Sequence, residues 1–344
     1  PVGVCGIISP WNFPIAIAAW KSAPAMAFGN AIVLKPASQT PASAIAVTKI
    51  ISEQKEIPEG LFNLVLGGGG TIGHQMSGHS DINAISFTGS VGVGQTIYME
   101  AAKSMKKMQL EMGSKNPLLI MDDADINIAV ACATNGAYGG TGQKCTASSR
   151  LIVHEKVYKQ FIEKLIESIS ALKVGHALEE GSQMGPVSSE TQLQSNLDYV
   201  EIGKKEAKLA YGGSPMNMKT PGHYMEPTLF IDGDNKTTIN QEEMFGPIAC
   251  VIPVKSYEEG LEVANDTIFG LSSGIITKSL SKASDFKKNI KTGVTTVNLP
   301  TAGLDYHVPF GGRKASSFGP REQGTYAHEF FTHVKTTYVS PGKI

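Results

Sequence analysis

The chain has 344 residues, of which 41% are hydrophobic and 18% charged, as in an ordinary globular protein of about two domains. Its 30 basic and 31 acidic residues give a formal net charge of −1, so bulk charge recruits neither nucleic acid nor an anionic membrane. The sequence contains no apolar run near the roughly 20 residues of a membrane span, and no signal peptide is visible.

The four cysteines are widely scattered and form neither a CxxC pair nor a disulfide framework. This usage favours a reducing compartment, most simply the cytoplasm. The eight histidines show no metal-ligand spacing, and HExxH is absent, so we expect no metal site. Because the chain begins at Pro1, a preceding targeting segment stays open.

The first third of the chain alternates short apolar strands with helices. We expect strands at residues 2–8, 31–34, 61–66, 82–87 and 108–111, and helices at 15–28, 42–53, 71–77 and 92–103. This alternation predicts a parallel, doubly wound α/β sheet.

A second α/β pattern begins after about residue 113. We expect helices at residues 126–138, 155–171, 190–206, 257–264 and 281–289, and strands at 149–153, 208–211, 249–254, 273–276 and 293–297. The tail at 334–339 is β-prone and suited to pairing with a sheet edge.

Three residues have side chains suited to acyl chemistry. Cys145 lies in a Gly-rich loop, where a thiolate would be a strong nucleophile, although a lone cysteine is more often a small buried residue. Glu111 ends a predicted strand shortly before a glycine, where it could be a general base or a solvated loop residue. Asn12 lies between two prolines after the first strand, where its amide could donate to an oxyanion or cap a turn.

Two further stretches suit a phosphorylated ligand. Phe87–Gly94 (FTGSVGVG) lies between a strand and a helix, where backbone N–H groups bind phosphate. Its order is not G-x-G-x-x-G, and a Gly-rich turn alone is a weak signal. Lys35 ends a strand on the same predicted edge and could bind a ribose or a phosphate, or be a solvated charge.

Together, in this order, these stretches resemble the aldehyde dehydrogenase superfamily. The matching motifs are Pro10–Pro14 (PWNFP), Lys35-Pro36, Phe87–Gly94, Leu110–Gly113 (LEMG), Gly142–Cys145 (GQKC), Glu242–Pro247 (EEMFGP) and Pro309–Gly312 (PFGG). The resemblance implies a Rossmann-type cofactor domain at 1–113, a second α/β catalytic domain at 114–313, and a C-terminal return segment with an oligomerisation strand at 314–344. It also implies NAD or NADP as cofactor.

The resemblance further implies residue roles. Cys145 would attack the aldehyde, Asn12 would stabilise the oxyanion, and Glu111 would activate water to release the acid. The implied cofactor contacts are Trp11, Lys35, Ser38, Gly89, Ser90, Gly94, Glu243 and Phe245. Lys35 and Glu243 would hold the riboses, and Phe245 would pack by the nicotinamide.

Within the superfamily, Ile15–Pro24, Thr141–Arg150 and Arg321–Gly324 resemble α-ketoglutarate semialdehyde (2,5-dioxovalerate) dehydrogenases. The expected substrate is therefore an aldehyde with a carboxylate, with Arg313 or Lys21 as its cation. Succinate semialdehyde is the nearest alternative substrate. The full-length form would be a homodimer or homotetramer.

Three departures from the family pattern are visible. The family's usual N-terminal segment is absent, so we expect the chain to be a fragment. Whether such a fragment is active by itself stays open. Ser114 stands where the family has a second glycine, which would be strained if φ were positive. Ser38 replaces an acidic residue of NAD-preferring members, which predicts tolerance of NADP. Two other readings stay open: an inactive protein that retains the fold, and a thiol hydrolase working through Cys145.

Overall fold

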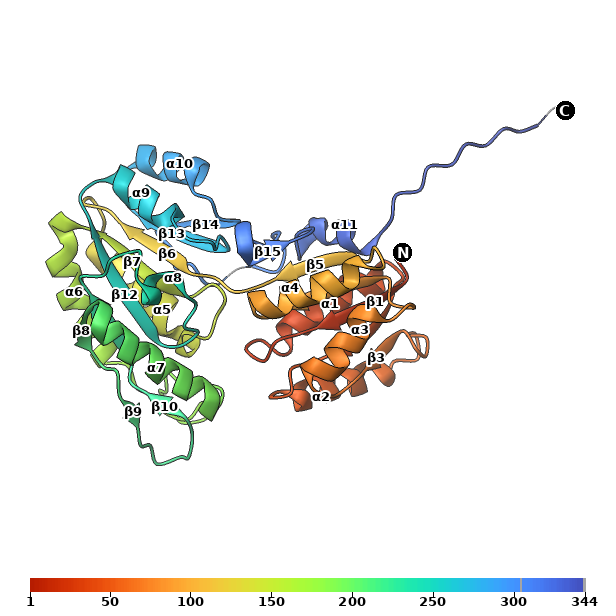
Figure 1. Ribbon diagram of the computed structural model, residues 1–344, viewed down its shortest axis with the longest axis horizontal. Helices are drawn as coiled ribbons and strands as arrows, with labels where there is room; N and C mark the ends of the chain where they lie inside the picture. Colours follow the sequence, from red (N-terminus) through yellow and green to blue (C-terminus); the bar gives the residue numbers. More distant parts are fainter. Residues whose placement is uncertain (304, 343–344) are drawn as a thin grey trace. The chain divides into compact units, whose positions relative to one another are not determined.

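The computed structural model describes residues 1–303 and 305–342, and the chain forms two compact units (Figure 1). The first unit comprises Pro1–Leu110, Tyr306–Pro309 and Gly319–Ile344, and the second comprises Glu111–Asp305 and Phe310–Phe318. The predicted domain bounds, 1–113, 114–313 and 314–344, stay a prediction.

A sheet in the order β5-β4-β1-β2-β3 forms the centre of the first unit. Its strands are β1 (Val4–Ile8), β2 (Ala31–Lys35), β3 (Phe62–Leu64), β4 (Ala84–Thr88) and β5 (Lys107–Glu111). The pairs β1–β2, β1–β4 and β2–β3 are parallel, which confirms the predicted doubly wound arrangement. The helices are α1 (Ala16–Ala27), α2 (Pro41–Ser52), α3 (His74–Gly78), α4 (Val91–Ala102) and α11 (Ala327–Phe331).

The second unit contains a larger sheet in the order β14-β13-β6-β7-β12-β11-β8. Its strands are β6 (Asn116–Ile120), β7 (Ser148–His154), β8 (Lys208–Tyr211), β11 (Thr228–Ile231), β12 (Ile248–Val254), β13 (Ser272–Ile276) and β14 (Val294–Val297). The neighbouring strands are parallel except for β8 and β11. A two-stranded hairpin, β9 (Pro215–Met216) and β10 (Tyr224–Met225), and the short β15 (Ser317–Phe318) complete its strands among the described residues.

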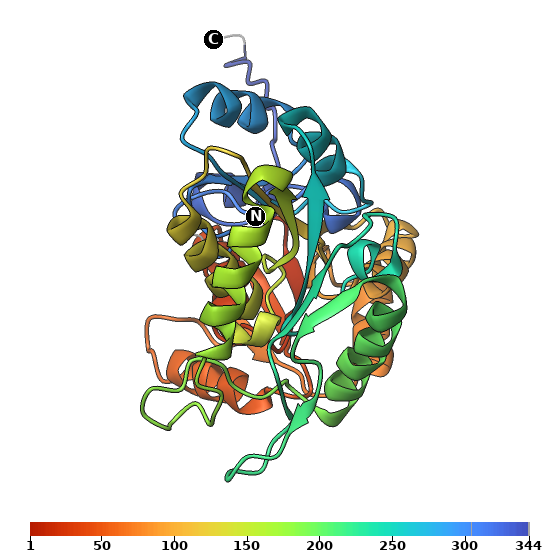
Figure 2. The same ribbon diagram turned by 90° about the vertical axis from the view of Figure 1, so that its left-hand side faces the viewer.

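Alternate residues of the central strands face opposite helical layers. Leu118 and Ile120 pack with α5 (Ile126–Tyr138) and α6 (Glu155–Ser170), whereas Leu119 packs with α9 (Tyr257–Asn265) and α10 (Leu280–Asn289). Because helices cover both faces of the sheet, the sequences of these central strands are continuous apolar runs. Figure 2 shows α6 (yellow-green) and α7 (Glu190–Glu206, green) on opposite sides of the strands. The short α8 (Thr238–Gln241) packs beside α7.

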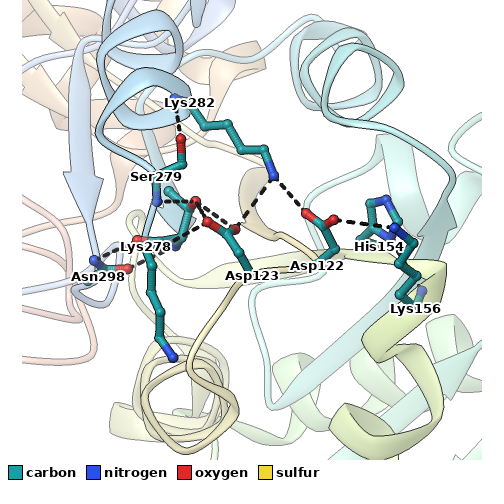
Figure 3. A network of polar contacts seen from close by, with 9 residues as sticks. Asp122, Asp123, His154, Lys156, Lys278, Ser279, Lys282 and Asn298 are labelled. Atoms are coloured by element: carbon teal, nitrogen blue, oxygen red, sulfur yellow. Dashed lines mark hydrogen bonds and ion pairs between the residues drawn. The ribbon is translucent and has the colours of Figure 1, made fainter.

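A polar network fixes the end of β6 to the start of α10 (Figure 3). Lys282 Nζ lies 2.6 Å from Asp122 Oδ1 and 3.6 Å from Asp123 Oδ1. The hydroxyl of Thr277 donates to both carboxylate oxygens of Asp123, at 2.8 and 2.9 Å. The loop after a buried central strand is therefore held by charge-assisted hydrogen bonds.

Several elements were not expected from the sequence. These are β6, β9, β10, β11, β15, α8 and α11. In β6, Pro117 breaks the strand pattern, and the register with β7 shifts between Asn116 and Pro117 to accommodate it. The β-prone tail at 334–339 forms no strand in this chain, and the side chains of Val334 and Tyr338 are exposed.

Candidate functional site

In the first unit, candidate residues follow the ends of three adjacent strands. Ile8 at the end of β1 pairs with Lys35 of β2 and with Phe87 of β4. Trp11 and Asn12 lie in the turn directly after β1, and both are half-buried. Since these strands are parallel, the predicted shared edge exists, and ligands of open α/β sheets bind at such edges.

The N-terminus of α4 lies at this edge. Ser90 is its N-cap residue, with an extended backbone (φ −74°, ψ 154°) and no side-chain cap hydrogen bond. The N–H of Gly94 closes the first helical turn on the Ser90 carbonyl at 2.9 Å. A Cβ at Gly89 would lie 2.5 Å from the Phe87 ring, whereas a Cβ at Gly92 would meet open space. This helix start, with uncapped N–H groups and open space beside it, fits a phosphate.

Lys35 is buried at the end of β2 and donates to the carbonyl of Pro36 at 2.7 Å. Burial lowers the pKa of its ammonium group. Lys35 is therefore not the solvated charge that was the alternative interpretation of the sequence. Ser38 lies three residues farther along, in an exposed turn.

Lys21 has a different environment from the one that its suggested role requires. It is buried in α1, forms an ion pair with Glu322 and donates to Ser86 Oγ at 2.8 Å. A buried, paired lysine does not meet a substrate carboxylate, so this candidate is wrong. Arg313 is exposed in the second unit and remains a candidate.

In the second unit, Cys145 lies in a loop with unusual backbone geometry. Gly140, Thr141 and Gly142 all have positive φ, between 60° and 64°. A β-branched threonine rarely adopts this conformation, and such strain gathers at functional sites. A Cβ at Gly142 would lie 2.1 Å from the Gly246 carbonyl oxygen, so only glycine fits there.

Asn116 and Thr301 hold this loop from the neighbouring backbone. Asn116 Nδ2 donates to the carbonyls of Cys145 and Ala147, at 2.7 and 2.8 Å. Thr301 Oγ1 donates to the Thr146 carbonyl at 2.7 Å. Cys145 itself is half-buried. Lys144, beside it, has a pKa lowered by burial, and its charge interacts favourably with the Cys145 sulfur.

Glu111 ends β5 as a buried carboxylate rather than a solvated loop residue. Its Oε2 accepts a hydrogen bond from Ser317 Oγ at 2.5 Å, and Ser317 Oγ accepts from the Gly312 N–H at 2.6 Å. This carboxylate therefore has a fixed hydrogen-bond partner within its own unit.

Glu243 rests on the backbone that follows Glu111. Its Oε1 accepts from the Ser114 N–H at 2.8 Å, and a Cβ at Gly113 would lie 2.3 Å from its Oε2. Enclosure of the carboxylate raises the pKa of Glu243 to about 7, against the opposing effects of the Ser114 N–H and Lys115. Glu243 and Phe245 line a small cavity together with Ser114 and Lys144.

Ser114 is not under the strain that a positive φ would impose, since it is absent from the positive-φ residues. Its hydroxyl donates to Asn116 Oδ1 at 2.6 Å. The serine at this position therefore supports the Glu111–Asn116 segment instead of distorting it.

Comparison with known proteins decides the family. The model of the "Aldehyde dehydrogenase family" matches residues 1–337. The chain belongs to the aldehyde dehydrogenase family. It is accordingly an oxidoreductase that acts on small aldehydes with NAD(P).

Two curated aldehyde dehydrogenases illustrate the similarity. The chain is 44% identical to the alpha-ketoglutaric semialdehyde dehydrogenase of Bacillus subtilis and to the alpha-ketoglutarate semialdehyde dehydrogenase of Haloferax volcanii, over 99% of its length in each case. It spans 70% and 71% of those proteins. An NAD+ complex of an aldehyde dehydrogenase from Bacillus cereus superposes with a TM-score of 0.95, at 38% identity, over 99% of this chain and 69% of that one.

In this aldehyde dehydrogenase, three polar residues beside the candidate groups were missed from the sequence. Asn116 is the third residue after the LEMG motif and directly precedes Pro117, and an Asn-Pro dipeptide is a turn signal. Lys115 is fully buried, and its Nζ has no hydrogen-bond partner among the residues that the structure describes. Ser317 lies 206 residues from Glu111, so no local pattern indicates their contact.

Within 1–303 and 305–342, no group of three or more histidine, cysteine, aspartate or glutamate side chains could hold a metal ion. In the same ranges, none of the helices combines the length and apolar character needed to cross a membrane.

Proposed function

We propose that this chain oxidises 2,5-dioxovalerate, the semialdehyde of 2-oxoglutarate, to 2-oxoglutarate. The observation that carries the proposal is the 44% identity, over 99% of the chain, to two dehydrogenases named for this semialdehyde. Succinate semialdehyde is a shorter aldehyde with the same terminal carboxylate and serves as the comparison substrate.

Cys145 is the proposed nucleophile. Its thiolate adds to the aldehyde carbon, and the carbonyl oxygen becomes an oxyanion of a thiohemiacetal. The amide of Asn12 and the N–H of Cys145 are the proposed donors to that oxyanion. The oxidised nicotinamide, when bound, supplies the acceptor for the hydride that the carbon then loses. The strained turn before Cys145 and the Asn116 bonds support a nucleophile held in one place.

Glu111 is the proposed general base for the second half of the reaction. A water molecule attacks the thioester carbon, and Glu111 takes a proton from that water. The thiolate of Cys145 leaves, and the carboxylic acid is released. A buried carboxylate with a fixed hydrogen-bond partner suits this task, since proton transfer requires the base to lie in a defined position.

The cofactor contacts are proposed in each unit separately. In the first unit they are Trp11, Lys35, Ser38, Gly89, Ser90 and Gly94. The uncapped start of α4 supports a phosphate contact there, and the buried Lys35 supports a contact at the strand edge. In the second unit they are Glu243, whose carboxylate would accept from ribose hydroxyls, and Phe245.

The remaining proposals concern recognition and assembly. Arg313 is the proposed cation for the substrate carboxylate, supported by its exposure. A homodimer or homotetramer is proposed from the resemblance of the 334–339 tail to the family's oligomerisation strand, and sedimentation of a full-length form as a monomer only would contradict it. A cytoplasmic location is proposed from the scattered cysteines.

The deciding experiment measures NADH and NADPH formation with 2,5-dioxovalerate and with succinate semialdehyde. We expect a higher kcat/KM for 2,5-dioxovalerate and no turnover in Cys145→Ala. We also expect Arg313→Ala to raise the KM for 2,5-dioxovalerate but not for pentanal, which has no carboxylate.

Contrary outcomes are distinguishable. A preference for succinate semialdehyde would replace the substrate, and undiminished turnover in Cys145→Ala would remove the nucleophile. Ester cleavage without any cofactor-dependent aldehyde oxidation would favour the thiol hydrolase. Cofactor binding without turnover by the folded protein would favour an inactive protein that retains the fold.

A further inference from the structure

We propose that Ser317 is a positioning residue for Glu111: its hydroxyl holds the carboxylate in one orientation, ready to take a proton from water. The proposal rests on the proposed role of Glu111 as general base. It concerns residues within the second unit alone.

The direction of the hydrogen bonds follows from the donors available. The Gly312 N–H has only a proton to give, so Ser317 Oγ accepts it at 2.6 Å. The hydroxyl proton of Ser317 is then directed to Glu111 Oε2, at 2.5 Å. This distance falls in the range of O–H···O⁻ bonds to an ionised carboxylate. The chain from Gly312 through Ser317 to Glu111 therefore favours the carboxylate form of Glu111.

The backbone around Ser317 is fixed to the backbone around Glu111. The Met112 N–H donates to the Ser316 carbonyl at 2.8 Å, and Ser316 Oγ donates to the Gly113 carbonyl at 2.8 Å. Ser316 Oγ also accepts from the Gly270 N–H at 3.0 Å. Ser316 is fully buried, so these bonds compete little with water. The hydroxyl of Ser317 is thus presented to Glu111 from a rigid support.

The hydrogen bond from Ser317 to Glu111 Oε2 has two consequences for the chemistry. It fixes the plane of the carboxylate that receives the proton of the attacking water. The same bond lowers the affinity of the carboxylate for a proton, since it stabilises the charged form. The hydrogen bond from Ser317 therefore fixes the orientation of Glu111 and lowers its basicity, so Glu111 stays ionised to a lower pH.

The test separates formation of the acyl-enzyme from its hydrolysis. With 4-nitrophenyl acetate, the initial burst reports acylation of Cys145 and the steady state reports deacylation. We expect Ser317→Ala to slow deacylation by about 10- to 100-fold while the burst rate changes little, as for loss of a bond to a charged group. We also expect the acidic limb of the deacylation pH profile to move to higher pH. Ser317→Thr keeps a hydroxyl and should restore most of the rate.

Controls separate this proposal from the one on which it rests. Ser281→Ala removes a hydroxyl from the exposed side of α10 and should leave both phases unchanged. Glu111→Gln should slow deacylation; if it does not, the general-base role itself is wrong. If Glu111→Gln slows deacylation but Ser317→Ala leaves its rate and pH profile unchanged, positioning by Ser317 is refuted. Equal slowing of both phases with an unmoved pH profile indicates a merely structural serine and also refutes it.

Discussion

The side chain of Asn116 uses its full hydrogen-bonding capacity. Its Nδ2 donates to two carbonyls of the Cys145 loop, and its Oδ1 accepts from the Ser114 hydroxyl and from the Ser272 N–H at 2.9 Å. Two donors and two acceptors are what a primary amide offers. The position of the Cys145 backbone is therefore set by an amide that is buried and cannot rotate.

We predict that Asn116→Ala lowers kcat by about 100-fold, because displacement of a reacting group by about 1 Å has an effect of that size. The rate of Cys145 alkylation by iodoacetamide should change as well, since the loop loses its support. Asn116→Asp keeps the acceptor but loses both donors, so it should behave like the alanine variant. Wild-type kcat in a folded Asn116→Ala protein would show that Thr301 alone holds the loop.

Ser38 bears on the choice between the two nicotinamide cofactors. It is exposed and carries no charge to repel the 2′-phosphate of NADP. We predict comparable turnover with NAD and NADP, and a loss of at least about tenfold in kcat/KM for NADP in Ser38→Glu, which corresponds to about 1.4 kcal/mol of repulsion. Strict dependence of the unaltered chain on NAD would contradict the prediction.

Lys115 and Glu243 lie near one another in the second unit, and burial shifts the pKa of each side chain. The pKa of Lys115 is lowered to about 7, with Arg150 as a second cause, while Cys250, Glu243 and Glu242 oppose the shift. The pKa of Glu243 is raised to about 7. The stabilising contribution from protonated Glu243 is thus lost as pH rises toward 7. The contribution from neutral Lys115 is lost as pH falls from about 10 toward 7.

We therefore predict that Lys115→Met raises the free energy of unfolding at pH 7 by about 1–4 kcal/mol, the range found when buried charged groups are replaced by apolar ones. The increase in stability between pH 7 and 9 should also become smaller, because the unfolded chain no longer binds the extra proton. Urea unfolding at both pH values measures this. Parallel pH dependence in the two proteins would mean that Lys115 is charged in the folded state over that range.

The polar network after β6 connects three chain segments. Asp123 accepts from the hydroxyl of Thr277 and from the Lys278 N–H at 3.1 Å, while Lys282 reaches both aspartates from α10 (Figure 3). The hydrogen bond from Lys282 lowers the pKa of Asp122 and raises that of Lys282. The stability that Asp122 provides is therefore present above its unfolded pKa and lost on acidification below it.

We predict that Asp123→Ala destabilises the protein by about 1–3 kcal/mol, because the buried Thr277 hydroxyl and the Lys278 N–H both lose their acceptor. Lys156→Ala is the matched control. Its ammonium group lies 3.6 Å from Asp122 on an exposed side chain, so the change should stay within about 0.5 kcal/mol. Equal losses in the two variants would contradict the assignment.

Hydrophobic patterning predicted the helices and strands whose apolar residues follow a regular pattern, and it missed elements such as β6 whose pattern is interrupted. The strands of the first unit end within a few residues of their predicted positions, since each is an apolar run between turn residues. The central β6 was missed because Pro117 is placed at a register shift that no local pattern reveals. The tail at 334–339 has β propensity, but a strand also needs a partner edge.

The candidate site was predictable where it depends on order along the chain. Parallel strands bring their ends to one edge, so the placement of Asn12, Lys35 and Ser90 in the first unit followed from local signals. The supports of Glu111 and Cys145 were not predictable. Ser317 and Asn116 act through contacts across 206 and 29 residues, and only the folded chain brings them together.

The proposed functions are distributed over both units. The first carries the helix start and lysine proposed for the cofactor, and the second carries the nucleophile and base. The two activities should therefore be separable by mutation even though the complete reaction needs both.

We predict that Lys35→Met weakens NAD binding by about 10-fold or more, the effect of one lost charge-assisted bond, while acylation of Cys145 by 4-nitrophenyl acetate stays near the wild-type rate. Quenching of tryptophan fluorescence on titration with NAD measures the binding, and the burst phase measures the acylation. Loss of both in a folded variant would show that Lys35 supports more than the cofactor.

The stretch from Glu111 to Asn116 contacts Ser317, Glu243 and the Cys145 loop within six successive positions. Neighbouring positions in this stretch therefore share their partners, and their substitutions will not combine independently. An exchange of Ser114 for glycine, for example, should change the tolerance for substitutions at Asn116, because the two side chains are hydrogen-bonded. Evolution of such a segment proceeds by linked replacements, and libraries that vary one position at a time will underestimate how many sequences it accepts.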